Sequence, residues 1–237
     1  MAGSFDGRHV VVTGGGGALG AAVATALLEQ GATVHIPARN QEEADRSTLR
    51  GHARVDLAPN VDLADEGQVE AFYTELPSLW ASIHVAGGFA MAPIARTSLE
   101  DLRGQIDTNL VTCFLCCREA VKKIRAGRDP AARTGRIVNT AAKPALVPVG
   151  GMAAYSCAKA GVAALTLALA EELRDEGVWV NAVVPSIMDT RANRRAMPDA
   201  DHDKWPKLEE VARTIVFLAS PENMVTRGAL VPVYGRS

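Results

Sequence analysis

Tyr155 and Lys159 stand four residues apart in a stretch whose apolar spacing predicts a helix over residues 152–177. Side chains at positions i and i+4 project from the same face of a helix. A free tyrosine has a pKa of about 10 and exchanges protons slowly near neutral pH, whereas a lysine cation beside it favours the phenolate and lowers that pKa. The spacing therefore predicts acid–base chemistry, in which Tyr155 supplies a proton to an anion that develops during reduction and Lys159 tunes it.

The run from Thr13 to Gly20, TGGGGALG, follows an apolar stretch and precedes an apolar helix. Glycines let the backbone turn sharply and approach a pyrophosphate, and the N–H groups at the start of the next helix attract the anion. This order of strand, glycine turn and helix predicts a dinucleotide-binding site. The glycine run by itself also suits a tight turn that binds nothing.

Composition narrows the class of protein. The chain has 237 residues, 48% of them hydrophobic, and its 25 Lys and Arg against 27 Asp and Glu give a net charge of −2. Such a chain can fill a core and has no basic field, so we expect neither nucleic acid nor a membrane as its partner. It has no uninterrupted run of about 18 apolar residues, and its first residues lack a signal-peptide pattern, which predicts a cytoplasmic protein.

The four cysteines are Cys113, Cys116, Cys117 and Cys157. Three of them crowd into one run with helical periodicity, and no histidine or further cysteine pair stands at zinc-finger spacing. The sequence therefore predicts buried or half-buried free thiols, no disulfide and no metal site.

Short β-rich runs alternate with helical runs along the whole chain. About seven strands with interleaved helices predict an α/β fold, a doubly wound parallel sheet of the Rossmann type, in a single domain over residues 1–237. Residues 98–127 predict one long helix that begins with a box-like cap made by Ser98 and Asp101. Residues 186–207 form the one long irregular segment, which predicts a substrate lid.

Three motifs together resemble the short-chain dehydrogenase/reductase family from about Arg8 to Gly235. They are a Thr-Gly-x-x-x-Gly-x-Gly turn, which departs from the pattern at Ala18, the Tyr-x-x-x-Lys pair, and an Asn-Ala-Gly-like stretch over residues 85–88. The resemblance implies an NAD(P)-dependent oxidoreductase in which the lysine also binds the nicotinamide ribose. It further implies that Asn109 supports a water-mediated proton relay, the alternative being a packing hydrogen bond from helix to strand.

The resemblance also implies which residues meet the cofactor. Asp62 and Leu63 match an adenine-contacting pair, with Asp56 as a competing candidate because VDLA occurs twice, and residues 185–190 match a segment that contacts the nicotinamide carboxamide, with Ser186 in place of glycine. The expected cofactor-binding residues are Gly14, Gly16, Gly17, Ala18, Leu19, Arg39, Asp62, Leu63, Ala86, Gly87, Gly88, Tyr155, Lys159, Pro185, Ile187 and Thr190.

The end of the second expected strand bears on the choice of cofactor. It runs out as Pro37-Ala38-Arg39-Asn40, without a carboxylate. An acidic residue there usually binds the ribose 2′-hydroxyl of NAD, whereas the guanidinium fork of Arg39 suits the 2′-phosphate of NADP. We therefore expect NADP(H) as the favoured cofactor and NAD(H) as the second choice. A solvated surface arginine is the alternative interpretation.

Ala142 stands where most members of the family have a serine that donates a hydrogen bond to the substrate oxygen. Either Thr140 or a different substrate then compensates for the lost donor. With residues 85–88, 142–146 and 189–198, Ala142 resembles the dihydropteridine reductase branch, whose members use tyrosine and lysine without the serine. Arg39 departs from the animal members of that branch, which prefer NADH through an acidic residue.

The resemblance leaves two substrate classes, a quinonoid dihydropteridine or similar conjugated C=N compound, and a carbonyl compound. The residues expected to contact the substrate are Phe89, Ala142, Met152, Arg191 and Trp205. Two interpretations compete with a reductase. Ala142 would suit a nucleotide-binding regulator with little catalysis, and the two long helices would suit a scaffold. Family members often pair these helices, so we expect a homodimer or homotetramer.

Overall fold

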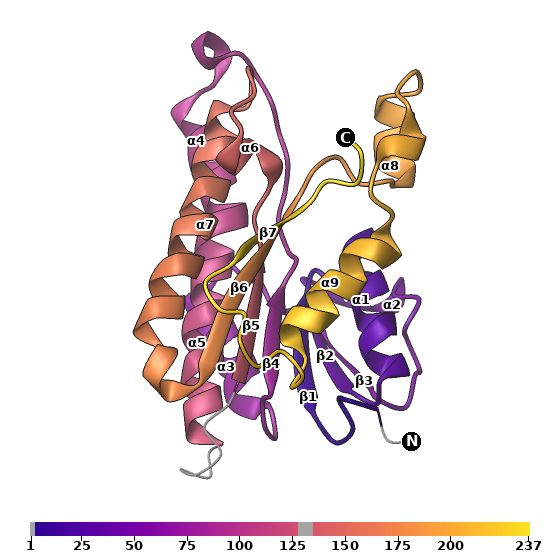
Figure 1. Cartoon of the computed structure of the whole chain (residues 1–237), viewed down its shortest axis with the longest axis vertical. Helices are drawn as coiled ribbons and strands as arrows, with labels where there is room; N and C mark the ends of the chain where they lie inside the picture. Colours follow the sequence, from indigo (N-terminus) through magenta and orange to yellow (C-terminus); the bar gives the residue numbers. More distant parts are fainter. Residues whose placement is uncertain (1–2, 128–134) are drawn as a thin grey trace.

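The computed structural model describes residues 3–127 and 135–237, and a sheet of seven parallel strands forms its centre (Figure 1). The strand order is β3-β2-β1-β4-β5-β6-β7, so the direction of winding reverses between β1 and β4. This order confirms the predicted doubly wound α/β fold. The strands are β1 (His9–Thr13), β2 (Thr33–Pro37), β3 (Val55–Ala58), β4 (Ala81–His84), β5 (Gly135–Thr140), β6 (Val178–Pro185) and β7 (Leu230–Val233).

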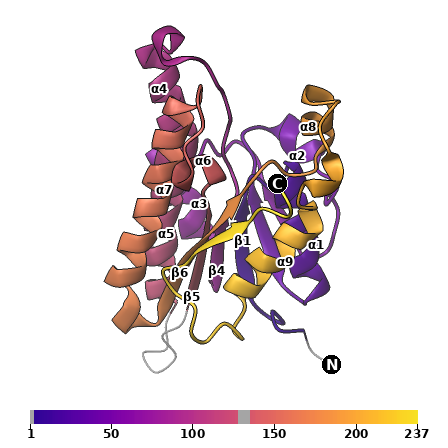
Figure 2. The ribbon, with the colours of Figure 1, turned by 45° about the horizontal axis from the view of Figure 1, so that its top comes forward.

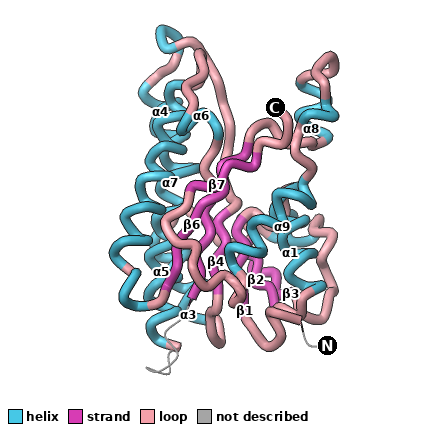
Figure 3. Tube along the Cα trace, in the orientation of Figure 1, coloured by secondary structure: helices cyan, strands magenta, loops and turns pink. Residues whose placement is uncertain are grey.

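Helices cover both faces of the sheet, as Figure 3 shows by colour. One core cluster joins the sheet to α3, α5 and α7, and the other joins it to α1 and α9. A strand buried on both faces needs continuous apolar residues, which explains the run Val10–Val12 in β1. The helices are α1 (Ala18–Glu29), α2 (Gln41–Asp45), α3 (Glu66–Glu75), α4 (Leu99–Ile106), α5 (Thr112–Ala126), α6 (Lys143–Leu146), α7 (Ala153–Glu172), α8 (Arg191–Ala196) and α9 (Leu208–Ala219).

The long helix expected over residues 98–127 is divided by a wider turn. Asp107–Val111 has π-helical hydrogen bonding between α4 and α5, and it carries Asn109. The predicted cap is confirmed, since Ser98 Oγ accepts from the Asp101 amide and the Asp101 carboxylate accepts from the Ser98 amide. A π turn inserts one residue into the helix and rotates the residues after it, and such turns often occur at functional sites.

Two segments are more ordered than the sequence predicted. Residues 186–207 are not irregular throughout, because α8 and a short 3₁₀ turn at His202–Lys204 lie within them. The short helix α6, which has a proline in its first turn, was not predicted. Figure 2 shows α4, α6 and α8 at one end of the molecule, beyond the carboxyl ends of the strands. That end is where ligands bind in open α/β sheets.

Helix α7 is the one described helix that is long and apolar enough, by length and composition, to cross a membrane. In this structure it packs against β6 and against α4 and α6. A core helix of an α/β fold can meet the same criteria of length and composition, so this helix alone is weak evidence for a membrane span.

Candidate active site

The glycine turn after β1 is held by close backbone contacts. Gly14 has a left-handed φ of +69°, and a Cβ there would lie 2.8 Å from the Ala86 amide nitrogen. A Cβ on Gly20 would lie 2.1 Å from the Gly14 carbonyl oxygen. Both positions therefore require glycine, because any side chain would push the first turn away from α1 or from the loop after β4.

The start of α1 is open to an anion. Gly17 is its N-cap, and no described side chain caps the first turn of the helix. Free N–H groups with the positive end of a helix dipole form a phosphate cradle. Ala18 is the exposed first helical residue, so its methyl group meets no described packing partner, whereas the Leu19 side chain is buried in the core. The chain here fits a dinucleotide pyrophosphate, with Leu19 offering only its backbone.

Three predicted residues meet at the loop after β4. Asn109 Oδ1 accepts from the Gly88 amide at 3.2 Å, and Asn109 Nδ2 donates to the Gly88 carbonyl at 3.0 Å and to the Gln105 carbonyl at 3.0 Å. A Cβ on Gly87 would lie 2.7 Å from Asn109 Oδ1 and 3.2 Å from Lys159 Nζ. The loop, Asn109 and Lys159 thus lie close together, and the Asn109 amide bonds to this loop and to α4 rather than to a strand.

Lys159 and Tyr155 lie on the first turns of α7. Lys159 is 5% exposed, and its Nζ donates to the Thr140 carbonyl at 2.8 Å, while burial lowers the pKa of its ammonium to about 8. Burial raises the pKa of Tyr155 to about 12, and the Phe89 ring stands edge-on to the Tyr155 ring at 5.0 Å. Desolvation of the phenol is the cause of this rise, and the expectation that Lys159 lowers the pKa of Tyr155 stays a prediction.

Ala142, where the resemblance implies a serine, is 5% exposed and precedes α6. Thr140 Oγ1, the donor expected to compensate, is enclosed and makes no hydrogen bond with the described residues. Among the residues of the expected catalytic motifs that the structure describes, Tyr155 therefore carries the hydroxyl that is left to donate to a substrate.

A carboxylate that was missed at the level of sequence lies beside Arg39. Glu43 Oε2 accepts from the Arg39 amide and from Arg39 Nε, both at 3.1 Å. The other oxygen, Glu43 Oε1, lies 3.2 Å from where a Cβ of Gly16 would stand. The sequence prediction considered only residues 37–40 at the end of β2. Asn40 caps α2, and this helix brings Glu43 back over the glycine turn.

The two candidate aspartates for the adenine are separated by the fold. Asp56 lies within β3, where its carboxylate accepts a hydrogen bond from His35 Nδ1 at 3.0 Å. Asp62 lies beyond the carboxyl end of β3 and is exposed, and Leu63 beside it is buried. Only Asp62 is at the end of the sheet where the glycine turn lies.

The segment after β6 leads into α8. Pro185 is buried and Ile187 is exposed, while the Thr190 hydroxyl caps α8 by accepting from the Asn193 amide at 3.0 Å. Arg194 and Lys207 both contact the Asp189 carboxylate, which holds its pKa well below the usual range. This ion-pair group ties the base of α8 to the start of α9.

The expected substrate residues do not all share one surface. Phe89 is 58% exposed beside Tyr155, and Met152 is half-buried before α7. Arg191 is exposed on α8. Trp205 is 6% exposed and its ring packs on His202 at 4.5 Å, so its place in a substrate pocket stays a prediction. Its role in this structure is to anchor the segment between α8 and α9.

Exposed apolar side chains gather on the loops around Tyr155. The Ala92 amide donates to the Gly151 carbonyl at 2.9 Å, so the loop after β4 and the loop before α7 are joined. Large apolar residues exposed on these loops and on α6 are Phe89, Met91, Ile94, Leu146, Val147 and Val149. We call these six residues the apolar rim.

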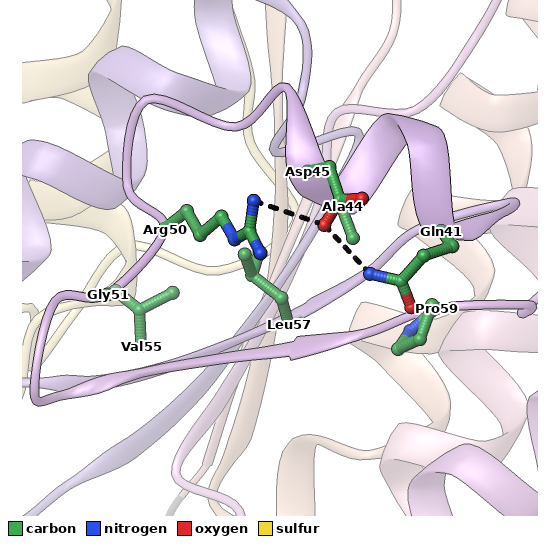
Figure 4. Close-up of a pocket in the computed structure, with 8 residues that line it drawn as sticks. All are labelled: Gln41, Ala44, Asp45, Arg50, Gly51, Val55, Leu57 and Pro59. Atoms are coloured by element: carbon green, nitrogen blue, oxygen red, sulfur yellow. Dashed lines mark hydrogen bonds and ion pairs between the residues drawn. The ribbon is translucent and has the colours of Figure 1, made fainter.

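A separate hollow lies between α2 and β3, at the edge of the sheet (Figure 4). The Asp45 carboxylate accepts from Gln41 Nε2 at 2.9 Å there, and Arg50 pairs with it at 3.4 Å. None of the residues expected to do chemistry lines this hollow.

Known proteins match almost the whole chain. The family model described as short chain dehydrogenase matches residues 8–201. A 3beta-hydroxysteroid dehydrogenase 1 of Eggerthella lenta is 31% identical over 98% of this chain and 94% of its own length. A meso-2,3-butanediol dehydrogenase of Serratia marcescens is 30% identical over 98% of this chain and 94% of its own length. The solved structure titled ElxO with NADP bound has a TM-score of 0.87 at 24% identity, covering 96% of this chain and 97% of its own, which bears on the fold alone.

The chain belongs to the short-chain dehydrogenase/reductase family. It is an NAD(P)-dependent oxidoreductase of that family, as its motifs implied.

Asn109→Leu should destabilise the chain. The substitution removes the partners of the half-buried Gly88 amide and carbonyl, which costs about 1 to 3 kcal/mol in the free energy of unfolding. Urea denaturation followed by circular dichroism measures this change. Gln105→Ala is the matched control one helical turn earlier, because its side chain makes only a 3.5 Å contact with Asn109. Equal stability of the two variants would contradict the role given to Asn109.

Proposed function

We propose that the chain transfers a hydride from NADPH to a conjugated C=N or C=O substrate, with Tyr155 as the proton donor. The observation that carries this proposal is the meeting of Gly87, Asn109 and Lys159 at the loop after β4, with Lys159 on the same helix α7 as Tyr155. A bound nicotinamide dinucleotide supplies the hydride. The residues of the chain hold the proton, the ribose and the loop in place.

Tyr155 and Lys159 divide the acid–base work. With a pKa of about 12, Tyr155 holds its proton until an anion develops beside it, which suits a proton donor in the reducing direction. Lys159 lies between the Thr140 carbonyl and Gly87, so its ammonium is placed to hydrogen-bond a ribose hydroxyl. Asn109 fixes the loop rather than moving a proton through its own amide, because its donor and acceptor atoms are occupied by backbone.

The missing second donor bears on the substrate. With Ala142 buried and Thr140 Oγ1 enclosed, one hydroxyl remains to polarise the acceptor atom. A substrate whose double bond is already polarised by conjugation, of the dihydropteridine type, tolerates this loss better than a simple ketone. The apolar rim further favours a ring-shaped, largely apolar substrate over a polyol.

The nucleotide-binding regulator remains the alternative function. Its support is Ala142, and the buried, hydrogen-bonded Lys159 and Asn109 weigh against it, because a chain that only bound nucleotide would not need the phenol beside them.

We also propose a substrate lid over residues 186–207, a cytoplasmic location and a homodimer or homotetramer. The lid is supported by α8, whose base is tied down by Asp189 while most of its side chains are exposed. Assembly is supported by large apolar side chains exposed on α5 and α7, Phe114 at 47% and Leu167 at 46%.

Tyr155→Phe should abolish NADPH oxidation in the presence of substrate. Loss of the proton donor lowers kcat by about 10²- to 10⁴-fold, whereas the dissociation constant of NADPH, measured by fluorescence titration, changes little. Tyr234→Phe is the control and should keep nearly full activity, since no role here uses its hydroxyl. Retained turnover in Tyr155→Phe would remove Tyr155 from the mechanism.

Cofactor preference should follow the charges around Arg39. Arg39→Asp reverses the NADPH preference, because a carboxylate repels the 2′-phosphate and accepts from a 2′-hydroxyl. Glu43→Gln frees the Arg39 guanidinium and raises the NADPH-to-NADH ratio of kcat/KM about three- to tenfold, near 1 kcal/mol. Glu42→Gln on the same short helix, which contacts Arg46 instead, is the control. An unchanged NADPH-to-NADH ratio of kcat/KM in Arg39→Asp would show that Arg39 does not determine the cofactor preference.

Substrate class is tested by comparing kcat/KM for a quinonoid dihydropteridine and for simple ketones. We expect the conjugated C=N compound to turn over faster. Ala142→Ser should raise the turnover of ketones by up to about 10²-fold by restoring a donor, with a smaller effect on the conjugated substrate. Wild-type chain that prefers simple ketones would overturn the dihydropteridine-type choice and leave hydride transfer itself intact.

A further inference from the structure

Beneath the loop after β4 lies a buried cluster that the mechanism does not use. His84 ends β4, and Cys113 and Cys117 lie one helical turn apart on α5. A ring nitrogen of His84 and the two sulfur atoms all lie within 4.8 Å of one another. In the sequence only the cysteines stand close together. The packing of α5 on β4 brings His84 next to them.

Asn139 turns an oxygen atom toward the same point. Thr166 Oγ1 donates its one hydrogen to the Val162 carbonyl at 2.8 Å, so it accepts from Asn139 Nδ2 at 2.9 Å. The amide oxygen of Asn139 therefore faces the cluster and accepts from His84 Nδ1 at 2.8 Å and from Cys117 Sγ at 3.4 Å. The four donor atoms are one nitrogen, two sulfurs and one oxygen.

The ring of His84 is oriented from behind. His84 Nε2 contacts Ser82 Oγ at 2.8 Å, and Ser82 Oγ contacts the Tyr73 hydroxyl at 2.8 Å. A metal-bound histidine nearly always has such a partner on its other nitrogen, which fixes the ring and its tautomer. His84 Nδ1 donates to the Asn139 amide oxygen, so metal binding moves the ring proton from Nδ1 to Nε2, where Ser82 Oγ accepts it, and frees the Nδ1 lone pair for the ion.

We propose that His84, Cys113, Cys117 and Asn139 bind one zinc ion. Tetrahedral zinc with bonds of about 2.3 Å to sulfur and 2.0 Å to nitrogen sets a sulfur-to-nitrogen distance of about 3.5 Å, close to the 3.4 Å between Cys117 Sγ and His84 Nδ1. The 2.8 Å between His84 Nδ1 and Asn139 Oδ1 must widen to about 3.3 Å when the ion enters. Binding releases the two thiol protons, and two thiolates neutralise the 2+ charge. Neutrality matters because the four residues are at most 5% exposed.

The ion would join elements that position the active site. It would connect β4, β5 and α5. His84 directly precedes Val85 in the loop after β4, and Asn139 directly precedes Thr140, whose carbonyl accepts from Lys159. Closed sites with four protein ligands are structural rather than catalytic. We assign the ion this structural role, which goes beyond the proposed hydride transfer and does not depend on it.

The test is metal content. The full chain is produced in zinc-replete medium, purified without a chelator or a metal-affinity resin, and analysed by mass spectrometry of the metal. We expect close to one zinc per chain, kept on dialysis against a chelator and released on unfolding, since the site is enclosed. Chain produced with Co²⁺ should show thiolate-to-cobalt charge-transfer absorption.

The remaining cysteines provide the controls. Cys116→Ser with Cys157→Ser leaves Cys113 and Cys117 as the sole cysteines and should keep both the zinc and the cobalt absorption. Cys113→Ser with Cys117→Ser should lose both. Zinc-free wild-type chain, or metal that follows Cys157 instead, would overturn the proposal. Should the second double variant fail to fold, the cobalt absorption of the first decides, because its absence overturns the proposal on folded protein.

Discussion

The ammonium of Lys159 is almost fully enclosed by protein, and its Nζ donates to the Thr140 carbonyl. Burial disfavours the charged form and lowers the pKa of Lys159. The lysine is held in this place because α7 packs on β6 and on the turn that carries Asn109.

The same constraint explains the glycines around it. Gly14, Gly20 and Gly87 each stand where a Cβ would overlap backbone atoms or the Asn109 side chain. The parallel sheet brings the ends of β1, β4 and β5 to one edge, and the loops that leave them must pass each other within van der Waals contact. Tight backbone packing leaves the edge of the sheet free for a flat ligand.

The order of strands and helices, the glycine turn, the Tyr-Lys pair and the family could be predicted from the sequence, because each depends on local periodicity or on a short motif. Side-chain directions and burial could not be predicted in this way. The Trp205 ring packs on His202, and burial raises the pKa of Tyr155. Glu43 was missed because the expected position of an acidic residue was sought in the strand, not on the helix after it.

The sequence by itself determined the doubly wound sheet, the glycine turn after its first strand and the spacing that puts a phenol and an ammonium on one helix. These follow from hydrogen bonds and hydrophobic periods within a few residues. Only the tertiary structure decided that Arg39 forms an ion pair with Glu43, that Asn109 hydrogen-bonds Gly88, and that His84 in β4 lies beside two thiols of α5. Such contacts join residues whose side chains no local pattern directs toward one another, and their geometry is set by how strands and helices pack.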